Sequence, residues 1–338
     1  MVSKKLIEIE APEKYLSVTW QVNNFCNFSC TYCNPGNWIG DSPNEGNTEL
    51  YIANIDKIIA KYKARDYKQF KFFFSGGEPT AWKNFIPICE HLKEILPDCT
   101  IAVNTNLSRP RAWWEKHLHL FDDVVASFHV EQCKKEQYAE TSIYLCDKLN
   151  YMSSKILLHD ERFWECVAFG EHLKKVMPNY FIEWTPLYDE LSANAGPWEY
   201  KDPKKTEFIE QHSIEQEETI ENPNKRESGT ASYTVREDGD EQVCTSNNVI
   251  VNRENFFTGW NCDIGDCVFI SPVGEVSLAS CGLSGVVGHI LDDISKVGPK
   301  TITCTKFHCM CGTDIIIPKH WTGEEVKSER KIPISHIA

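Results

Sequence analysis

Three cysteines, Cys26, Cys30 and Cys33, stand in the stretch Cys-Asn-Phe-Ser-Cys-Thr-Tyr-Cys, directly after a strand-like run at residues 17–22. Thiolates are ligands of zinc and of iron–sulfur clusters. Closed structural zinc sites and ferredoxin-type clusters each use four protein ligands. Three thiolates at this spacing leave one iron of a four-iron cluster without a protein ligand, and chemistry is expected at that iron. A zinc knuckle and a ferredoxin-like site are the alternatives.

A second motif, Gly76, Gly77, Glu78 and Pro79, follows a mostly apolar run at residues 70–74. A short apolar run that ends in paired glycines is typical of a strand that meets a ligand. Because glycine has no Cβ, the backbone there can approach a bound molecule closely. An isolated tetrapeptide of this kind is a common turn. One strand after the three cysteines, it supports a ligand site.

Taken together, the CxxxCxxC array, with Tyr32 directly before its third cysteine, and the Gly-Gly-Glu-Pro turn resemble the radical S-adenosylmethionine (radical SAM) enzymes. The resemblance implies that the three cysteines hold a catalytic 4Fe-4S cluster and that SAM chelates its fourth iron. It also implies that SAM lies along the Gly-Gly-Glu-Pro turn, with Tyr32 near the adenine. An electron donor such as flavodoxin or ferredoxin is an implied partner.

Strand and helix signals alternate from residue 15 to about residue 189. Strands are expected at 17–22, 70–74, 100–103, 124–127, 155–158 and 180–184, and helices at 48–62, 85–96, 112–117, 136–151 and 162–176. Six βα units with parallel crossovers predict an α/β fold, a partial (β/α)6 TIM barrel. Ligands of such a fold bind beyond the carboxyl ends of the strands, and both motifs fall there.

Polar residues also follow the third and fourth predicted strands. By the resemblance, Asn106 and Ser127 are candidates for contacts to SAM, and a strand-end cap or turn is the alternative for each. His129 is a candidate substrate ligand or acid/base, although a lone histidine is more often structural.

A second group of cysteines lies in the region that begins at Asn255, and two β-type runs around residues 272–274 predict a hairpin there. The region is similar to the SPASM and twitch extensions of radical SAM enzymes, which bind an auxiliary iron–sulfur cluster. It departs from a full SPASM domain, because its late cysteine group is too small for two clusters. We expect one auxiliary cluster, of 4Fe-4S type, with Cys304 as the main competitor of the favoured ligands and Cys267 less favoured. The favoured ligands are Cys262, Cys281, Cys309 and Cys311. A structural zinc site is the alternative.

Charge and composition exclude some classes of function. The chain has 338 residues and a net charge of −14, which disfavours extended contact with duplex nucleic acid. No run approaches the roughly 20 apolar residues that span a bilayer, and the N-terminus has no apolar core of signal-peptide length. We therefore expect a cytoplasmic protein without a membrane partner. Fifteen cysteines in such a chain indicate metal ligation more than disulfides.

The predicted organisation has five parts. Residues 1–14 form an N-terminal extension, 15–195 the radical SAM partial barrel, 196–245 a polar linker or insertion, 246–320 a small iron–sulfur (SPASM/twitch-like) domain and 321–338 a C-terminal tail. The linker is predicted from the charged and polar composition of residues 198–243. Asp238 and Gly239, flanked by β-type runs, predict a hairpin.

By the resemblance, the leading interpretation is an enzyme of oxidoreductase or isomerase type. It would cleave SAM reductively to a 5′-deoxyadenosyl radical and abstract hydrogen from a small polar substrate, in a dehydrogenation or a rearrangement. One alternative is a SPASM-type peptide-modifying maturase, which the lack of a leader-peptide-binding domain before Tyr15 disfavours. Another is a non-catalytic iron–sulfur scaffold protein. Whether the substrate is a small molecule, a nucleotide or a peptide is left open by the sequence.

Overall fold

Six parallel strands in chain order form the centre of the protein. The computed structural model describes residues 5–33, 47–177, 181–187, 198–218, 232–244, 246–309 and 311–323. The strands are β2 (Tyr15–Gln21), β3 (Gln69–Ser75), β4 (Thr100–Thr105), β5 (Asp123–Phe128), β6 (Tyr151–Leu158) and β7 (Phe181–Pro186). Each pairs in parallel with the next strand in the sequence. The predicted α/β fold with six successive βα strands is confirmed, and the strand order fits a partial barrel.

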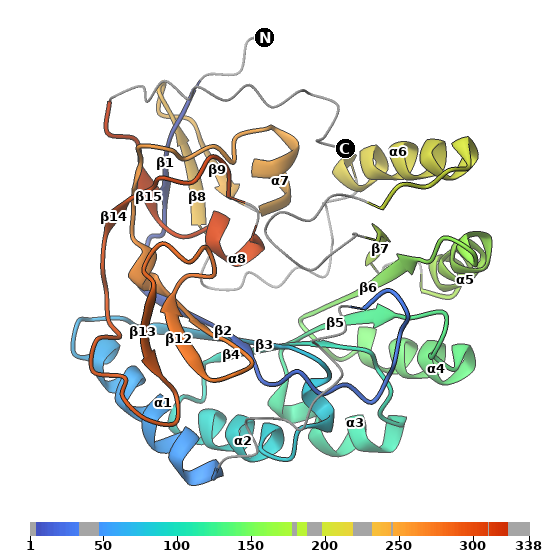
Figure 1. Cartoon of the computed structure of the whole chain (residues 1–338), viewed down its shortest axis with the longest axis horizontal. Helices are drawn as coiled ribbons and strands as arrows, with labels where there is room; N and C mark the ends of the chain where they lie inside the picture. Colours follow the sequence, from blue (N-terminus) through green and yellow to red (C-terminus); the bar gives the residue numbers. More distant parts are fainter. Residues whose placement is uncertain are drawn as a thin grey trace.

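The helices that connect these strands lie on one face of the sheet (Figure 1). They are α1 (Thr48–Lys63), α2 (Phe85–Ile95), α3 (Arg111–His117), α4 (Lys135–Cys146) and α5 (Phe163–Val176), with the short 3-10 helices η2 (Pro79–Ala81) and η3 (Leu118–Leu120). Alternate residues of β3, Phe70, Phe72 and Phe74, are buried on this face. Burying a side chain of this size contributes about 1.5–3 kcal/mol. None of the helices within the described residues is long and apolar enough to cross a membrane.

Helix α1 shows how local sequence signals set these elements. Asn47 caps its N-terminus by accepting a hydrogen bond from the Glu49 N–H, and two lysines lie in its last turn. Its buried residues recur with helical spacing on one face: Tyr51, Asn54, Ile55, Ile58, Ile59 and Tyr62. The predicted helix at 48–62 is confirmed, because its caps and its apolar face agree.

Two neighbouring predicted boundaries are wrong. The helix expected at 136–151 ends at Cys146, and β6 begins at Tyr151 instead of residue 155. Tyr151 pairs with Asp123 at the start of β5, so the ladder of β5 and β6 runs from the first residue of each strand. At Tyr151, pairing with the neighbouring strand therefore outweighs the expected helical periodicity.

The C-terminal region extends the barrel sheet. Strand β11 (Cys267–Ile270) pairs in parallel with β2, and β12 (Glu275–Leu278) and β13 (Val286–His289) follow it. The predicted hairpin around residues 272–274 is confirmed, and Gly274 takes a φ of 90° in its turn. The result is a nine-stranded sheet in which β2 is an interior strand.

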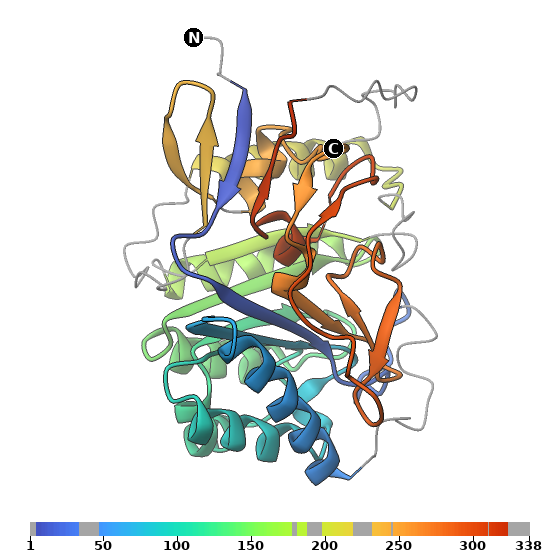
Figure 2. The ribbon, with the colours of Figure 1, turned by 90° about the vertical axis from the view of Figure 1, so that its left-hand side faces the viewer.

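A second sheet brings distant parts of the chain together. Its order is β14 (Ile302–Thr303), β10 (Asn261–Cys262), β15 (Lys319–His320), β1 (Leu6–Glu10), β8 (Ser232–Arg236) and β9 (Glu241–Cys244). Figure 2 shows β1 beside the β8–β9 hairpin. The hairpin predicted at Asp238 and Gly239 is confirmed, with Gly239 at a φ of 82°.

The stretch that was expected to be a polar linker thus supplies β8, β9 and α6 (Pro203–Glu218). The remaining short elements are α7 (Ser246–Val251), η4 (Ile264–Asp266) and α8 (Gly312–Ile315). The domain boundaries stay predictions, and residues 324–338 of the expected tail lie outside the described residues.

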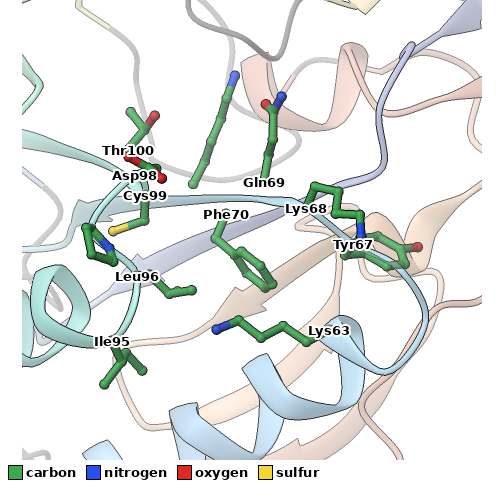
Figure 3. Close-up of a pocket in the computed structure, with 12 residues that line it drawn as sticks. Lys63, Tyr67, Lys68, Gln69, Phe70, Ile95, Leu96, Asp98, Cys99 and Thr100 are labelled. Carbon is green, nitrogen blue, oxygen red and sulfur yellow. The ribbon is translucent and has the colours of Figure 1, made fainter.

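A hollow of about 610 Å³ lies at the amino ends of β3 and β4 (Figure 3). Lys63 and Phe70 lie on its wall, with the Lys63 ammonium 6.0 Å from the centre of the Phe70 ring. In β/α barrels this end of the strands serves stability, and reactions take place at the other end. The hollow is therefore remote from the two sequence motifs.

Candidate active site

A cavity of about 370 Å³ lies at the carboxyl ends of the barrel strands. It brings together the three cysteines of the loop after β2, called the cysteine loop (residues 23–33), and Tyr32. Five other predicted site residues line the same cavity: Gly76, Gly77, Asn106, Ser127 and His129. Neither Glu78 nor Pro79 lines it. The sequence therefore located the cavity and most of its predicted contacts, although the roles of these residues stay predictions.

The donor set of the cysteine loop suits an iron–sulfur cluster. A backbone hydrogen bond of 3.1 Å from the Cys33 N–H to the Cys30 carbonyl folds its end into a turn. Burial raises the pKa of Cys26 to about 11 and that of Cys30 to about 12, so both thiolates need a cationic partner. Within the described part of the chain, no three His, Cys, Asp or Glu side chains converge on one metal position. The irons of a cluster occupy separate corners, so three soft thiolates around one cavity form a suitable donor set.

The carboxylate of Glu78 lies beneath the cavity and is completely buried. Its Oε1 accepts hydrogen bonds from the Thr80 N–H and hydroxyl, at 3.0 and 2.6 Å, and from the Thr105 hydroxyl at 2.7 Å. Its Oε2 accepts the Asn106 N–H at 2.7 Å. Burial raises the pKa of Glu78, and these bonds oppose that shift. The side chain thus joins the end of β3 to the end of β4.

The structure gives a different reason for glycine at residue 77 from the one expected. A Cβ there would lie 1.9 Å from the carbonyl oxygen of Phe25 and 3.0 Å from the nitrogen of Cys26. The close approach is made by the cysteine loop itself, not only by a bound molecule. At Gly76 a φ of 129° also requires glycine. The glycine pair therefore lets β3 and the cysteine loop pack backbone against backbone.

Asn106 holds the beginning of the cysteine loop. Its side-chain amide donates to Asn27 Oδ1 at 2.9 Å and lies 3.6 Å from the sulfur of Cys26. Ser127, on the next strand, donates to Asn104 Oδ1 at 3.2 Å. Asn106 is thus placed against a predicted cluster ligand, whereas Ser127 contacts a neighbouring strand.

Tyr32 and His129 form one wall of the cavity. The Tyr32 hydroxyl and His129 Nδ1 are hydrogen bonded at 2.8 Å, and the two rings stack with centroids 6.0 Å apart. Burial lowers the pKa of His129 to about 4, so the imidazole is neutral near pH 7. A neutral histidine can accept or relay a proton or orient a ligand, but it is not charged in the resting protein.

Sequence reasoning named Glu183 as a residue near the cavity but missed its charged partner Lys155. Lys155 and Glu183 lie two residues before Leu157 and Thr185, which line the cavity, so they face the same barrel interior. Their charged groups are 3.4 Å apart, and Glu183 also accepts a hydrogen bond from Thr185 at 3.3 Å. The period-two pattern of β6 and β7 was the signal that could have shown them.

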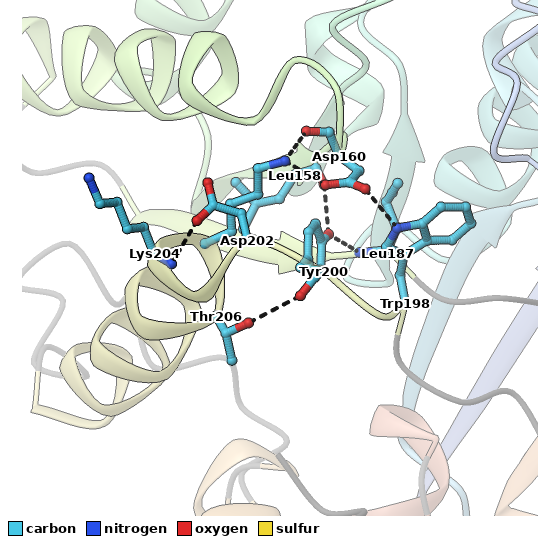
Figure 4. A network of polar contacts seen from close by, with 9 residues as sticks. Leu158, Asp160, Leu187, Trp198, Tyr200, Asp202, Lys204 and Thr206 are labelled. Carbon is cyan, nitrogen blue, oxygen red and sulfur yellow. Dashed lines mark hydrogen bonds and ion pairs between the residues drawn. The ribbon is translucent and has the colours of Figure 1, made fainter.

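A network of polar contacts fixes the rim of the cavity beside β7 (Figure 4). The Tyr200 hydroxyl donates to the Leu158 carbonyl at 2.6 Å and accepts the Leu187 N–H at 3.0 Å. Lys205, in the first turn of α6, forms an ion pair with Asp160 at 2.6 Å. These contacts tie the segment before α6 to the ends of β6 and β7.

The C-terminal cysteines gather around β10, α8 and the segment between β14 and α8. Cys262 interacts electrostatically with Cys304 and Cys281, and Cys309 with Cys262 and Cys311. They do not converge on a single ion position within the described residues. By contrast, Cys267 is fully buried at the start of β11, with its sulfur 3.8 Å from Asp314.

A buried lysine lies among these thiols. The Lys319 ammonium donates to the carbonyl oxygens of Asp314, Ile315 and Ile317 at 2.6–3.0 Å. Burial raises the pKa of Cys262 and that of Cys309 to about 12, and the charge of Lys319 acts in the opposite direction. Its positive charge therefore favours thiolates in this group.

The part of the chain that contains the cysteine loop is similar to a known protein family. The model of the Radical SAM superfamily matches residues 20–139 of this chain. This part of the chain therefore resembles the radical SAM superfamily. The matched part includes the cysteine loop, the Gly-Gly-Glu-Pro turn and His129, whereas the C-terminal cysteines lie outside it.

Curated relatives match over a limited part of the chain. GTP 3′,8-cyclase of Mannheimia succiniciproducens is 29% identical over 93 residues, which is 28% of this chain and 26% of the relative. GTP 3′,8-cyclase of Edwardsiella ictaluri is 34% identical over 85 residues, 25% of each chain. The alignments thus span about a quarter of the length of these relatives.

Similar solved structures cover more of the chain at lower identity. One is anSMEcpe with bound AdoMet, with 16% identity and a TM-score of 0.48 over 83% of this chain and 79% of that chain. Another is Streptococcus suis SuiB bound to S-adenosylmethionine, with 11% identity and a TM-score of 0.42 over 80% and 61%. Likenesses this distant leave the substrate open.

Replacing Gly77 tests the contact between the glycine turn and the cysteine loop. In Gly77→Ala the added methyl group collides with the Phe25 carbonyl, so the loop must shift. Iron retention after reconstitution should fall by about tenfold, as for lost outer contacts of metal sites, and SAM binding should weaken. Gly298→Ala is the control, because a Cβ there meets no atom within 4 Å. Full iron retention and unchanged SAM affinity in Gly77→Ala would contradict the contact.

The lowered pKa of His129 predicts a pH dependence of folding. Its pKa is lowered from 6.5 to about 4. Between about pH 6.5 and pH 4, this histidine therefore binds a proton in the unfolded chain but not in the folded protein. Stability is therefore unaffected by this group above about pH 6.5 and falls as the pH drops, by about 2 kcal/mol between pH 7 and pH 5. His129→Asn should lose correspondingly less in urea unfolding at the two pH values. The exposed His119→Asn should behave like the wild type.

Proposed function

We propose that this protein is a radical SAM enzyme that reductively cleaves SAM and abstracts hydrogen from a small polar substrate. One observation carries the proposal: the cysteine loop and the glycine turn, distant in sequence, line one cavity at the carboxyl ends of the strands. Both lie in the part of the chain that matches the radical SAM superfamily. When bound, the cluster and SAM supply a 5′-deoxyadenosyl radical.

The residues of the cavity have separate tasks in this proposal. Cys26, Cys30 and Cys33 are the cluster ligands, and the backbone at Gly76 and Gly77 lies along SAM. Glu78 acts from beneath, because it holds the glycine turn against β4 without reaching the cavity. In this proposal the walls of the cavity limit the access of water and stray hydrogen donors to the reacting atoms.

The volume of the cavity and its polar lining residues, among them Asn104, Asn106 and Ser127, favour a small polar substrate. A volume of about 370 Å³ lies within the range of small-molecule sites. Lys155 and Glu183, which pair with each other, lie two residues before the lining residues Leu157 and Thr185. A nucleotide such as GTP, the substrate named in the matched relatives, is the first compound to test. The reaction is a dehydrogenation or a rearrangement, with electrons from a donor of flavodoxin or ferredoxin type.

Removing the three cysteines tests the catalytic assignment. The triple variant with Cys26, Cys30 and Cys33 changed to Ala should form no 5′-deoxyadenosine when reduced with SAM, because no thiolate is left to hold the cluster. Cys146→Ala, a change on α4, should keep wild-type turnover. Chromatography of the nucleoside product measures both. Wild-type product formation by the triple variant would exclude the assignment.

The proposal includes an auxiliary 4Fe-4S cluster in the C-terminal region. Its support is that Cys262 and Cys309 are each near enough to other cysteines of this region, and to Lys319, for the charges to affect their pKa values. A cluster there would accept an electron from a substrate radical or hold the segments together. Four bound thiolates favour either of these roles, whereas three would leave an iron open to the substrate.

Metal analysis distinguishes this cluster from zinc. Two four-iron clusters give about eight irons per reconstituted chain. The triple variant of the cysteine loop should retain about four of them, with Mössbauer parameters of a 4Fe-4S cluster. One cluster plus one zinc ion per chain would contradict the auxiliary cluster without affecting the catalytic one.

A further inference from the structure

The turn that follows β5 holds the cysteine loop. In this turn, at residues 129–132, the Gln132 N–H donates to the His129 carbonyl at 3.0 Å. Glu131 projects from the turn and accepts two hydrogen bonds from one residue of the loop, Thr31. The Thr31 N–H lies 2.8 Å from Oε2, and its hydroxyl lies 2.7 Å from Oε1. Thr31 directly follows Cys30 in the sequence.

His159, at the end of β6, lies behind the Glu131 carboxylate. Its Nε2 is 3.2 Å from Glu131 Oε1, and only 12% of its side chain is exposed, against 17% for Glu131. The imidazole also packs edge-on against the Tyr32 ring, with centroids 5.5 Å apart. The carboxylate is therefore held on one side by a histidine and on the other by the cysteine loop.

The same turn holds the next residue of the loop through another side chain. His129, the first residue of the turn, is hydrogen bonded to Tyr32, and Glu131 is bonded to Thr31. The two residues that separate Cys30 from Cys33 are thus both fixed by one rigid turn. A bidentate bond to a carboxylate is charge-assisted and strongly directional.

We propose that Glu131 is a positioning residue for the catalytic cluster. It fixes the backbone between Cys30 and Cys33 through Thr31, and its negative charge lowers the reduction potential of the cluster. The inference rests on the proposed function. Outer hydrogen bonds orient metal ligands and typically change metal affinity by about 10–100-fold. A fixed negative charge beside a cluster opposes electron uptake, and net charge is one of the factors that set cluster potentials.

Two substitutions of Glu131 separate its effect on the position of the cysteine loop from the effect of its charge on the reduction potential. Glu131→Ala removes both acceptors, so iron release from the reconstituted protein to a chelator should be about tenfold faster than from the wild type. Glu131→Gln keeps the size and one acceptor but removes the charge. It should retain iron nearly as well as the wild type, while the midpoint potential of the cluster, followed by electron paramagnetic resonance, shifts upward.

Two further variants complete the test. Thr31→Val removes the hydroxyl donor and keeps the N–H, so its iron release should fall between those of the wild type and Glu131→Ala. Glu136→Gln removes one charge from the exposed first turn of α4 and should change neither quantity. If Glu131→Ala fails to fold, as thermal unfolding would show, Thr31→Val and Glu131→Gln decide the matter.

The outcomes separate this inference from the proposed function. Wild-type iron release in Glu131→Ala and Thr31→Val, or an unshifted potential in Glu131→Gln, would overturn the role of Glu131 while the cysteine variants still lose the catalytic cluster. Retention of that cluster by the triple cysteine variant would instead refute the proposed function. Faster release with an upward shift supports the inference.

Discussion

The buried carboxylate of Glu78 is the interaction on which the arrangement of the cavity depends. A carboxylate that is removed from water must be fully hydrogen bonded, because an unpaired buried charge costs several kcal/mol. Glu78 meets this requirement with four donated bonds from Thr80, Thr105 and Asn106. Satisfying one charge therefore fixes the ends of β3 and β4 relative to each other. Asn106, held in this way, in turn bonds the start of the cysteine loop.

The register of β2 and β3 determines where the cysteine loop and the glycine turn begin relative to each other. Strands β2 and β3 pair without a shift from Tyr15 and Gln69 to Gln21 and Ser75. The Val22 N–H continues the ladder to the Ser75 carbonyl at 2.9 Å. The cysteine loop and the glycine turn consequently begin side by side, and the glycines allow their backbones to touch. The turn after β5 then closes on the far end of the loop through Glu131 and His129.

The C-terminal region stabilises the same strand from its other side. Because β11 pairs with β2, the strand that carries the cysteine loop has neighbours on both edges and is buried almost throughout. The C-terminal cysteines near Lys319 lie before and after β11 in the sequence. A second contact joins the regions, because the Thr19 hydroxyl of β2 lies 3.4 Å from the Thr313 hydroxyl of α8. The C-terminal region is thus in direct contact with the strand that precedes the cysteine loop.

The sequence by itself determined the features that depend on local spacing. The three-cysteine array, the glycine turn, the six strand–helix repeats and both hairpins could be predicted, because periodicity and turn chemistry act within a few residues. Most predicted contacts, from Gly76 to His129, do line one cavity, since parallel strands bring their carboxyl ends together.

Only the tertiary structure decided which residues meet across the fold. The SAM contact expected at Glu78 stays a prediction, and the structure adds that its buried carboxylate bonds Thr105 and Asn106 at the end of β4. Glu131 is 100 residues from Thr31 in the sequence, so no local pattern joins them. The ion pair of Lys155 and Glu183 depends on the register of β6 and β7. The pairing of β11 with β2 joins segments about 250 residues apart. Such contacts arise from the packing of complete elements, and a local pattern does not contain them.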